Sequence, residues 1–206
     1  MNKIRTIIAD DHAVVRTGLA ALLDAEPDIS VVGEAEDGAD AVRCALRLKP
    51  DVIVMDLMMP VKDGIDATRE IRAALPETKV LILTTSGVSD DIARALDAGA
   101  AGAILKSASN AKLVAAIRAV FAGKSAVSED VRKMLQADPP IQDLTERQLE
   151  ILNSVTRGFT NRDIARQFGI REDSVKEHLY NIFEKIGASN RAEAVAIALR
   201  KHLLKI

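Results

Sequence analysis

Five polar side chains stand directly after apolar runs in the N-terminal part of the chain. They are Asp10, Asp11, Asp56, Thr84 and Lys106. Such runs are typical of buried strands, and the carboxyl ends of parallel strands meet at one edge of a sheet. Taken singly, an Asp pair is usually a helix cap and a Lys is usually a surface residue. Their coincidence at the ends of several strands predicts one shared site.

The carboxylates expected at this edge predict a metal site. Crowded carboxylates repel one another and raise one another's pKa unless a cation compensates. Mg²⁺ prefers one or two carboxylates together with waters and a phosphate oxygen. Asp10 or Asp11, Asp56 and the main-chain carbonyl of Met58 could supply the protein ligands. We therefore expect Mg²⁺ as a cofactor.

The same edge has the groups that phosphoryl transfer needs. Asp56 is the expected nucleophile, because a carboxylate at a strand end can form an acyl phosphate. The ammonium of Lys106 would neutralise the oxygens of a transferred phosphoryl group, and the hydroxyl of Thr84 would donate a hydrogen bond to it. These residue types therefore predict a phosphoacceptor site with two side chains that contact the transferred phosphoryl group.

The spacing of apolar residues predicts an α/β domain in this part of the chain. Strand-like runs alternate with segments of helical periodicity, which is typical of a parallel sheet covered by helices. The expected strands cover 4–9, 30–34, 51–56, 79–84 and 102–105. A further helix over 110–121 ends at Gly123, a common stop residue.

Only helices are expected from Leu144 onward. The expected helices run from Thr145 to Gly158, from Arg162 to Phe168 with Asn161 as cap, from Glu172 to Ile186, and from Asn190 to Leu203. A short helix, a tight turn with Gly and a second helix form the helix-turn-helix signature. We divide the chain into a domain at 1–125, a partly helical linker at 126–143 and a small all-α four-helix domain at 144–206.

The composition limits the class of protein. Cys44 is the single cysteine, so the chain has no internal disulfide, and no apolar run approaches the length of a membrane span. We expect a cytoplasmic protein that has no membrane partner. Asp and Glu outnumber Lys and Arg over 1–126, whereas Lys and Arg prevail over 144–206. This asymmetry is a weak indication of two functions.

The N-terminal segments resemble the receiver domain of two-component response regulators. The matching segments are Ile8-Ala9-Asp10-Asp11-His12, Asp56-Leu57-Met58-Met59-Pro60 with Asp63-Gly64, Leu83-Thr84, and Ala103-Ile104-Leu105-Lys106. The resemblance implies a flavodoxin-like fold with five parallel strands in the order 2-1-3-4-5. It also implies Mg²⁺ at Asp10, Asp11 and Asp56, phosphorylation of Asp56 by a partner sensor histidine kinase, and Thr84 and Lys106 as phosphoryl sensors.

Two positions depart from the receiver pattern. Receivers often have Tyr or Phe as a rotamer switch where this chain has Ala103, and a methyl group cannot swing between buried and exposed states. Many receivers have Pro where this chain has Ser107, so the receiver pattern does not fix the geometry of this peptide bond. Neither change alters the expected phosphoacceptor chemistry.

The segment Glu172 to Ile186 has the pattern of a DNA-reading helix. Apolar residues at Val175, Leu179, Ile182 and Ile186 define one buried stripe. The remaining surface offers polar side chains that suit base edges and phosphates, although a plain solvated helix face is the alternative. The candidate DNA contacts are Lys176, Glu177, Tyr180, Asn181 and Lys185.

The C-terminal segments resemble the LuxR-type helix-turn-helix. The matching segments are Leu144-Thr145-Glu146-Arg147, Gly158-Phe159-Thr160-Asn161-Arg162-Asp163-Ile164-Ala165, Ser174-Val175-Lys176-Glu177-His178 and Lys185-Ile186-Gly187. Together with the receiver-like segments, these C-terminal segments make the chain similar to the NarL/FixJ family of response regulators. The resemblance implies that Glu172 to Ile186 enters the major groove of promoter DNA, and that the last helix pairs with its copy in a homodimer formed on phosphorylation. RNA polymerase is a further candidate partner.

The favoured interpretation is a phosphorylation-gated DNA-binding transcriptional regulator that turns over no external substrate. An aspartyl-phosphate phosphatase is one alternative, but that class needs a second Asp where this chain has Met58. A flavin or dinucleotide carrier would need a Gly-rich or hydroxyl-rich loop where this chain has Asp10-Asp11-His12-Ala13. A regulator that binds DNA without phosphate stays open because of Ala103.

Overall fold

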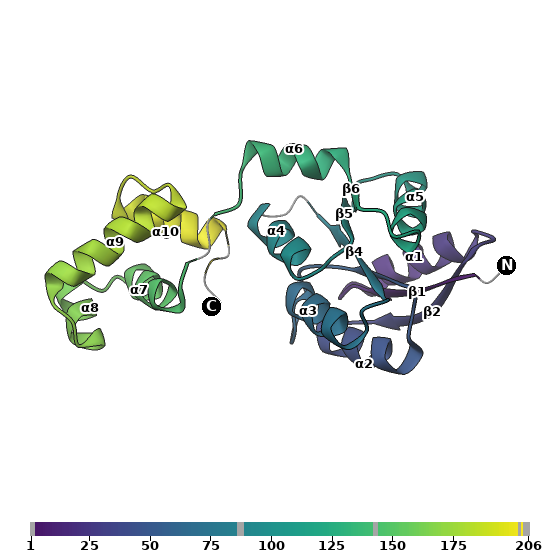
Figure 1. The fold of residues 1–206 in the computed structure, drawn as a ribbon, viewed down its shortest axis with the longest axis horizontal. Coiled ribbons are helices and arrows are strands. Elements are labelled where there is room, and N and C mark those ends of the chain that lie inside the picture. Colours follow the sequence, from purple (N-terminus) through teal and green to yellow (C-terminus); the bar gives the residue numbers. More distant parts are fainter. Residues whose placement is uncertain (1–2, 86–88, 142–143, 202, 204–206) are drawn as a thin grey trace. The chain divides into compact units, whose positions relative to one another are not determined.

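The computed structural model describes residues 3–85, 89–141, 144–201 and 203. The chain divides into two compact units, Met1–Pro139 and Pro140–Ile206 (Figure 1). The boundaries expected at 143 and 206 lie outside the described residues. Each unit has hydrophobic core clusters of its own.

The first unit is built on a parallel sheet. Its strands are β1 (Ile4–Ala9), β2 (Ile29–Ala35), β3 (Val52–Met55), β4 (Lys79–Thr84), β5 (Gly102–Leu105) and β6 (Ala126–Val127). Their order is β2-β1-β3-β4-β5-β6, and all neighbours run parallel. The first five strands confirm the flavodoxin-like order 2-1-3-4-5. Because β2 lies on one side of β1 and the later strands lie on the other, the connecting helices lie on both faces of the sheet.

The expected count of five strands is wrong, because β6 adds a sixth at the edge next to β5. Two residues are too few to show the alternation from which a strand is predicted. The pairing of Ala126 with Gly102 explains how the strand fits. A Cβ on Gly102 would lie 2.6 Å from the carbonyl oxygen of Ala126, so only glycine allows this close approach.

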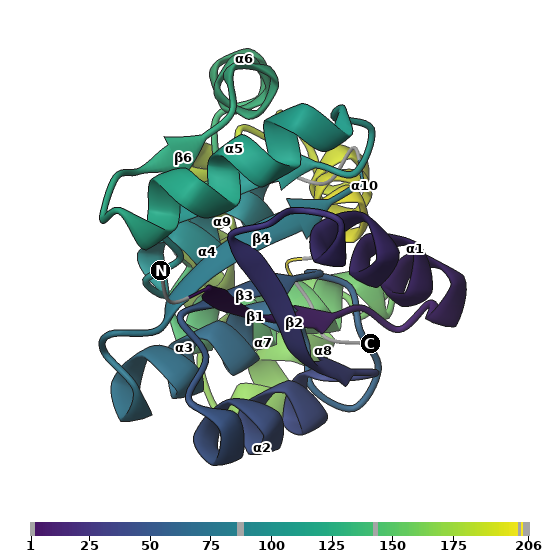
Figure 2. The same ribbon diagram turned by 90° about the vertical axis from the view of Figure 1, so that its right-hand side faces the viewer.

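Helices cover the two faces of the sheet (Figure 2). They are α1 (Ala13–Asp24), α2 (Gly38–Leu48), α3 (Gly64–Ala74), α4 (Ser89–Asp97), α5 (Asn110–Phe121) and α6 (Glu129–Ala137). The side chains of α1 and α5 bury one face, with Leu23 and Ile117 fully covered. Those of α2, α3, α4 and α6 bury the other. Alternate residues of each strand contribute to both cores, which explains the unbroken apolar runs of the sequence.

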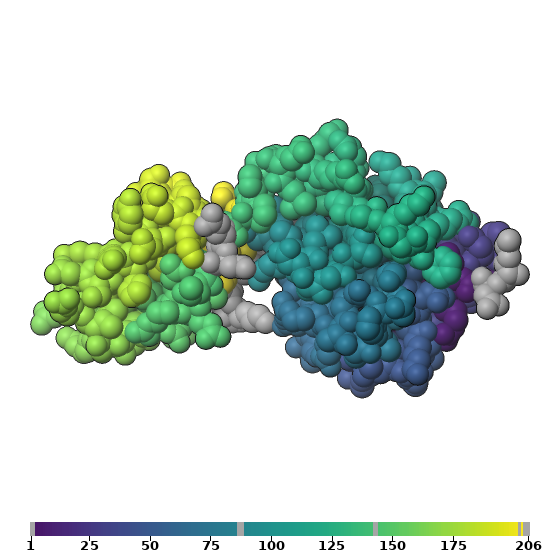
Figure 3. All heavy atoms as spheres, viewed as in Figure 1, coloured from purple at the N-terminus to yellow at the C-terminus, as the bar shows by residue number. Residues whose placement is uncertain are grey.

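The helix α6 belongs to the first unit, within the segment 126–143 that was expected to be a linker. Its Val131 is fully buried in the same core cluster as Ala103 and Ile92. At its C-terminal end, the hydroxyl of Ser89 on α4 donates a hydrogen bond of 2.9 Å to the carboxylate of Asp138. Figure 3 shows the atoms of α6 in close contact with the teal atoms of the neighbouring segments of this unit. Packing therefore ties α6 to the sheet.

The second unit consists of helices, as expected. They are α7 (Glu146–Thr156), α8 (Asn161–Phe168), α9 (Glu172–Ile186) and α10 (Arg191–Arg200). Thr145 and Gln148 form a capping box at the start of α7, and the side chain of Asn190 caps α10. The cap expected at Asn161 is wrong. Thr160 caps α8, because its hydroxyl and the carboxylate of Asp163 satisfy each other's main-chain N–H groups.

The buried stripe of α9 holds the second unit together. Val175, Leu179, Ile182 and Ile186 are all buried, as the sequence predicts. They pack against α7, α8 and α10 in one core cluster. The turn between α8 and α9 begins at Gly169, which has a φ of 65°. Among the described residues, no helix is long and apolar enough to cross a membrane.

Candidate phosphoacceptor site and DNA-reading helix

The two carboxylates at the ends of the central strands lie side by side and are buried. Asp10 follows β1 and is 1% exposed, and Asp56 follows the adjacent β3 and is 5% exposed. The main-chain N–H of Asp56 donates a 2.8 Å hydrogen bond to the carbonyl of Ala9, which continues the pairing of the two strands. The sheet therefore fixes the main chain at both carboxylates.

Lys106 joins these carboxylates from β5. Its Nζ donates a hydrogen bond of 2.7 Å to Oδ2 of Asp56, and it lies 2.6 Å from Oδ2 of Asp10. The contact with Asp10 is ionic and lacks the angles of a hydrogen bond. Thr84, at the end of β4, is buried, and its carbonyl accepts a 2.6 Å hydrogen bond from the N–H of Lys106. The structure thus brings together residues from four strand ends.

The acidic group extends to Asp11 and His12 at the start of α1. The Nδ1 atom of His12 lies 2.7 Å from Oδ1 of Asp11, and the main-chain N–H of His12 donates a 2.9 Å hydrogen bond to Oδ1 of Asp10. The candidate ligand atoms of these three residues all lie within 4.8 Å of one another. Sequence reasoning did not single out His12, although its place directly after the Asp pair was a usable signal.

These residues fit a hard divalent cation. Oδ2 of Asp10 is buried and accepts no hydrogen bond from any described residue. Its described counter-charge is the ammonium of Lys106 at 2.6 Å, which also serves Asp56, so the two buried carboxylates keep a net negative charge that a divalent ion would neutralise. Met58 lies two residues after Asp56 in the loop before α3, with its side chain exposed. A thioether is not a preferred ligand of a hard cation, so a contribution from Met58 would come from its main-chain carbonyl.

The charges in the site shift two pKa values. Burial raises the pKa of the Asp56 carboxyl, and the nearby Asp10 adds to this effect, while Lys106 opposes it. Burial works against the charge on Lys106, but its contacts with Asp10 and Asp56 outweigh burial and raise the pKa of the ammonium. An additional cation would favour the ionised form of Asp56.

The loop after Asp56 is strained and tightly packed. The N–H of Lys62 donates a 2.7 Å hydrogen bond to the carbonyl of Pro60, which closes a γ-turn around Val61. Val61 has a φ of 66°, a strained conformation for a β-branched residue, and it is 88% exposed. Gly64 then starts α3 so close to Asp56 that a Cβ would overlap the carbonyl oxygen of Asp56.

The exposed face of α9 presents four of the five predicted DNA contacts. Lys176, Glu177, Tyr180 and Asn181 are exposed there. Lys176 donates a 2.9 Å hydrogen bond to the carboxylate of Asp173, one turn earlier, which raises the pKa of its ammonium. The fifth residue, Lys185, is partly buried and donates a 3.1 Å hydrogen bond to the side-chain carbonyl of Gln148 on α7. Its amine is therefore engaged within the unit.

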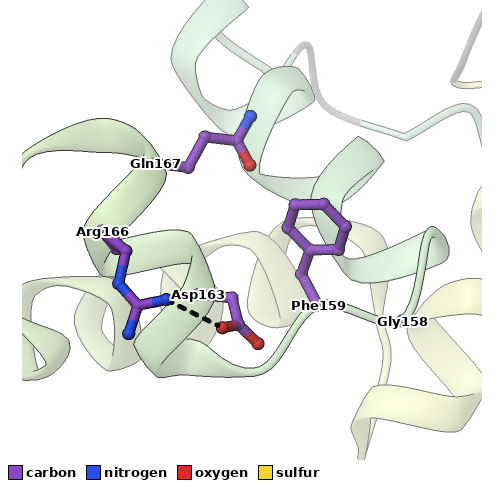
Figure 4. Close-up of a pocket in the computed structure, with 5 residues that line it drawn as sticks. All are labelled: Gly158, Phe159, Asp163, Arg166 and Gln167. Atoms are coloured by element: carbon purple, nitrogen blue, oxygen red, sulfur yellow. Dashed lines mark ion pairs between the residues drawn. The ribbon is translucent and has the colours of Figure 1, made fainter.

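A hollow of about 370 Å³ lies beside α8 (Figure 4). It is lined by Gly158, Phe159, Asp163, Arg166 and Gln167, and the Arg166–Asp163 ion pair of 3.9 Å stands at its edge. None of the predicted DNA contacts lines it. The guanidinium of Arg191 donates to the carbonyl of Phe159 and so ties the α7–α8 turn to α10.

The N-terminus of α9 lacks a side-chain cap, so a better capping residue should stabilise the second unit. Arg171 stands at the N-cap and makes no side-chain cap hydrogen bond. We expect Arg171→Ser to stabilise the second unit by about 1 kcal/mol, because the serine hydroxyl can accept a hydrogen bond from a free main-chain N–H of the first turn. Thermal unfolding of the full chain measures the change. Arg171→Ala is the matched control, and an equal gain in that variant would assign the effect to the lost charge instead.

Comparison with known families identifies a matching family for each unit of the chain. A model described as the response regulator receiver domain matches residues 6–118. A second model, described as bacterial regulatory proteins of the luxR family, matches residues 142–198. The chain belongs to the two-component response regulators that combine a receiver domain with a LuxR-type DNA-binding domain.

Individual relatives match nearly the whole chain. The transcriptional regulatory protein LiaR of Bacillus subtilis (strain 168) is 41% identical and covers 98% of this chain and 99% of its own. The response regulator protein VraR of Staphylococcus aureus (strain NCTC 8325 / PS 47) is 37% identical, with coverage of 98% and 99%.

Solved structures give the same result. The response regulator ChrA of a heme-sensing two-component system shares 39% identity with a TM-score of 0.60, over 99% of this chain and 100% of that one. RcsB from Salmonella enterica serovar Typhimurium, bound to promoter P1flhDC in the presence of phosphomimetic BeF3⁻, shares 26% identity with a TM-score of 0.74, over 98% and 100%.

Proposed function

We propose that this regulator is switched by phosphorylation of Asp56 and that the switch controls its binding to promoter DNA. The observation that carries the proposal is the position of Lys106, whose ammonium contacts both Asp56 and Asp10 at one edge of the sheet. A phosphoryl group on Asp56 would bring new oxygens to this ammonium and to the hydroxyl of Thr84. The phosphoryl donor is a sensor histidine kinase, and no external substrate is turned over.

The residues of the site have separate roles in phosphoryl transfer. An oxygen of Asp56 attacks the phosphorus of a phosphohistidine, the P–N bond breaks, and the imidazole leaves. Lys106 neutralises the phosphoryl oxygens, and Thr84 donates a hydrogen bond to them. Asp10, Asp11, Asp56 and the carbonyl of Met58 would hold Mg²⁺, which supplies positive charge to the phosphoryl oxygens when bound.

The surface around the acidic site suits a protein phosphodonor. Val14, Met58 and Val61 are large apolar side chains that are mostly exposed, and all three lie in segments next to the carboxylates. Apolar residues in such a position can pack against a helical partner while the reacting atoms meet. This arrangement supports the kinase as the partner.

The output surface is α9, with α10 as the dimer contact. The major groove of DNA admits a helix, and Lys176, Glu177, Tyr180 and Asn181 are exposed on the same helix. Leu199 on α10 is half exposed, which supports pairing of α10 with its copy. Phosphorylation would shift an equilibrium toward the dimer that binds DNA. RNA polymerase is a further proposed partner, and the cytoplasm is the proposed compartment.

Removal of the metal gives a direct test of phosphoacceptor chemistry. We expect the full chain to gain one phosphoryl group from acetyl phosphate in Mg²⁺, and the rate to fall by about two orders of magnitude or more in excess EDTA. Intact-protein mass spectrometry measures the uptake. Readdition of Mg²⁺ should restore the rate. Equal rates with and without Mg²⁺ would contradict the proposed metal role.

A second prediction concerns the proposed DNA contact of Lys176. Lys176→Gln should weaken binding similarly across DNA sequences and should reduce the slope of log affinity against log salt by about one, because one phosphate contact is lost. Fluorescence anisotropy at several salt concentrations measures both quantities. Lys133→Gln, which removes an exposed charge from α6 in the first unit, should leave the slope unchanged.

A further inference from the structure

We propose that the first unit carries a second anion site, which binds a phosphate group at the opposite edge of the sheet from Asp56. A hollow of about 330 Å³ opens there, beside the amino ends of β4 and β5. The residues that carry the argument are Arg72, Lys79, Gly99, Gly123, Lys124 and Ser125. A concave site of this size suits a small ligand.

Three cations from different elements line this hollow. Arg72 comes from α3, Lys79 from the first position of β4, and Lys124 from the loop between α5 and β6. No acidic side chain is among the described residues that line it. In the described part of the chain, neither Lys79 nor Lys124 forms an ion pair. Cations gathered without a counter-charge repel one another, and a bound anion would remove that repulsion.

The side chain of Arg72 is held in place even without a ligand. Its Nη1 atom donates a 2.7 Å hydrogen bond to the carbonyl of Thr78 and also donates to the carbonyl of Pro76. Gly99, with a φ of 102°, lies directly under it, and a Cβ there would come within 3.2 Å of Cγ of Arg72. The described contacts of the guanidinium use Nη1, so Nε and Nη2 are left to bind an anion. A fixed guanidinium matches the oxygens of a phosphate group.

The loop between α5 and β6 completes the site. Gly123 has a φ of 76°, which turns the chain so that Lys124 and Ser125 line the hollow together. The hydroxyl of Ser125 can donate a hydrogen bond to a phosphate oxygen. The combination of a guanidinium, two ammonium groups and a hydroxyl favours a phosphate dianion over a carboxylate, because a phosphate offers more oxygen acceptors.

This site is separate from the phosphoacceptor. Lys79 begins β4 and Thr84 ends it. A strand of this length separates its two ends by roughly 17 Å. A phosphoryl group on Asp56 therefore cannot reach the hollow, and the inference does not depend on the role of Asp56.

Titration of the isotopically labelled full chain with inorganic phosphate tests this inference. Magnesium is left out so that the acidic site stays unloaded. We expect saturable shifts in the NMR amide signals of Gly99, Gly123 and Ser125, with a dissociation constant below about 1 mM. The double variant Lys79→Gln/Lys124→Gln should weaken binding about tenfold or more, and Lys133→Gln should leave it unchanged. If the double variant does not fold, Lys124→Gln alone, in an exposed loop, carries the test.

Three outcomes would overturn the inference. They are shifts that grow linearly without saturation, shifts reproduced by sodium chloride at equal ionic strength, and shifts unaffected by the lysine variants. A parallel titration with adenosine monophosphate distinguishes a phosphate-bearing metabolite from free phosphate as the ligand. Binding of this nucleotide about tenfold tighter than inorganic phosphate supports a phosphate-bearing metabolite, and equal affinity supports free phosphate.

Discussion

Asp56→Asn is expected to lose phosphoryl uptake from acetyl phosphate by at least about three orders of magnitude. The amide of Asn is too weak a nucleophile to form the acyl phosphate, and the other carboxylate beside Lys106, that of Asp10, follows a different strand and is only 1% exposed. Mass spectrometry of the intact protein measures the uptake. Because burial raises the pKa of Asp56, replacing it with a neutral amide should not lower the thermal stability of the receiver at neutral pH.

The control for this variant removes an exposed carboxylate elsewhere. Asp130 lies on α6, is half exposed and pairs with Lys112 at 3.5 Å. Asp130→Asn should take up phosphate at the unmodified rate. Uptake that persists in Asp56→Asn, on Asp10, Asp11 or His12, would show that the phosphoacceptor is wrongly assigned.

Gly64→Ala is expected to damage both the fold and the site. A Cβ on Gly64 would overlap the carbonyl oxygen of Asp56 and approach Cα of Leu57 to 3.0 Å. Both contacts are with main chain, so no side chain can move aside, and the start of α3 must shift. We expect a loss of about 3 kcal/mol in the free energy of unfolding. Phosphoryl uptake should also fall, because the displaced main chain is that of Asp56.

A matched substitution separates this clash from the general effect of replacing glycine. Gly18 lies within α1, where a Cβ would meet nothing within 4 Å. Gly18→Ala should stabilise the receiver by about 0.5–1 kcal/mol, because alanine loses less conformational freedom in a helix. Chemical denaturation of both variants measures the difference. A Gly64→Ala protein as stable as the original would contradict the close packing of α3 on Asp56.

The strand ends and the buried stripe of α9 could be predicted from the sequence because each depends on a repeating pattern. An apolar run followed by a carboxylate indicates both a strand and its end, and parallel strands bring those ends to one edge. Asp10, Asp56 and Lys106 are therefore expected to lie together on the residue pattern alone. In the same way, the spacing of the buried residues from Val175 to Ile186 indicates one face of a helix.

The features that could not be predicted depend on contacts between distant segments. The strand β6 is recognised only from its pairing with Gly102 in the structure. The helix α6 packs on the sheet through Val131, and no local sequence pattern predicts that contact. The small side chain of Ala103 lies in the same cluster as Val131. The place of Lys185 on α9 predicts a DNA contact, but its hydrogen bond to Gln148 depends on how α7 packs.

The central claim is that phosphorylation of Asp56 controls DNA binding, and DNA affinity tests it most directly. A DNA fragment selected from genomic sequence by the phosphorylated protein serves as the probe, and fluorescence anisotropy measures the affinity of the full chain. With Mg²⁺ and beryllofluoride, a phosphoryl mimic, we predict affinity about tenfold or more above that without them, and no such gain in Asp56→Asn. Equal affinity of the original chain in both conditions would contradict the claim and would favour a regulator that binds DNA without phosphate.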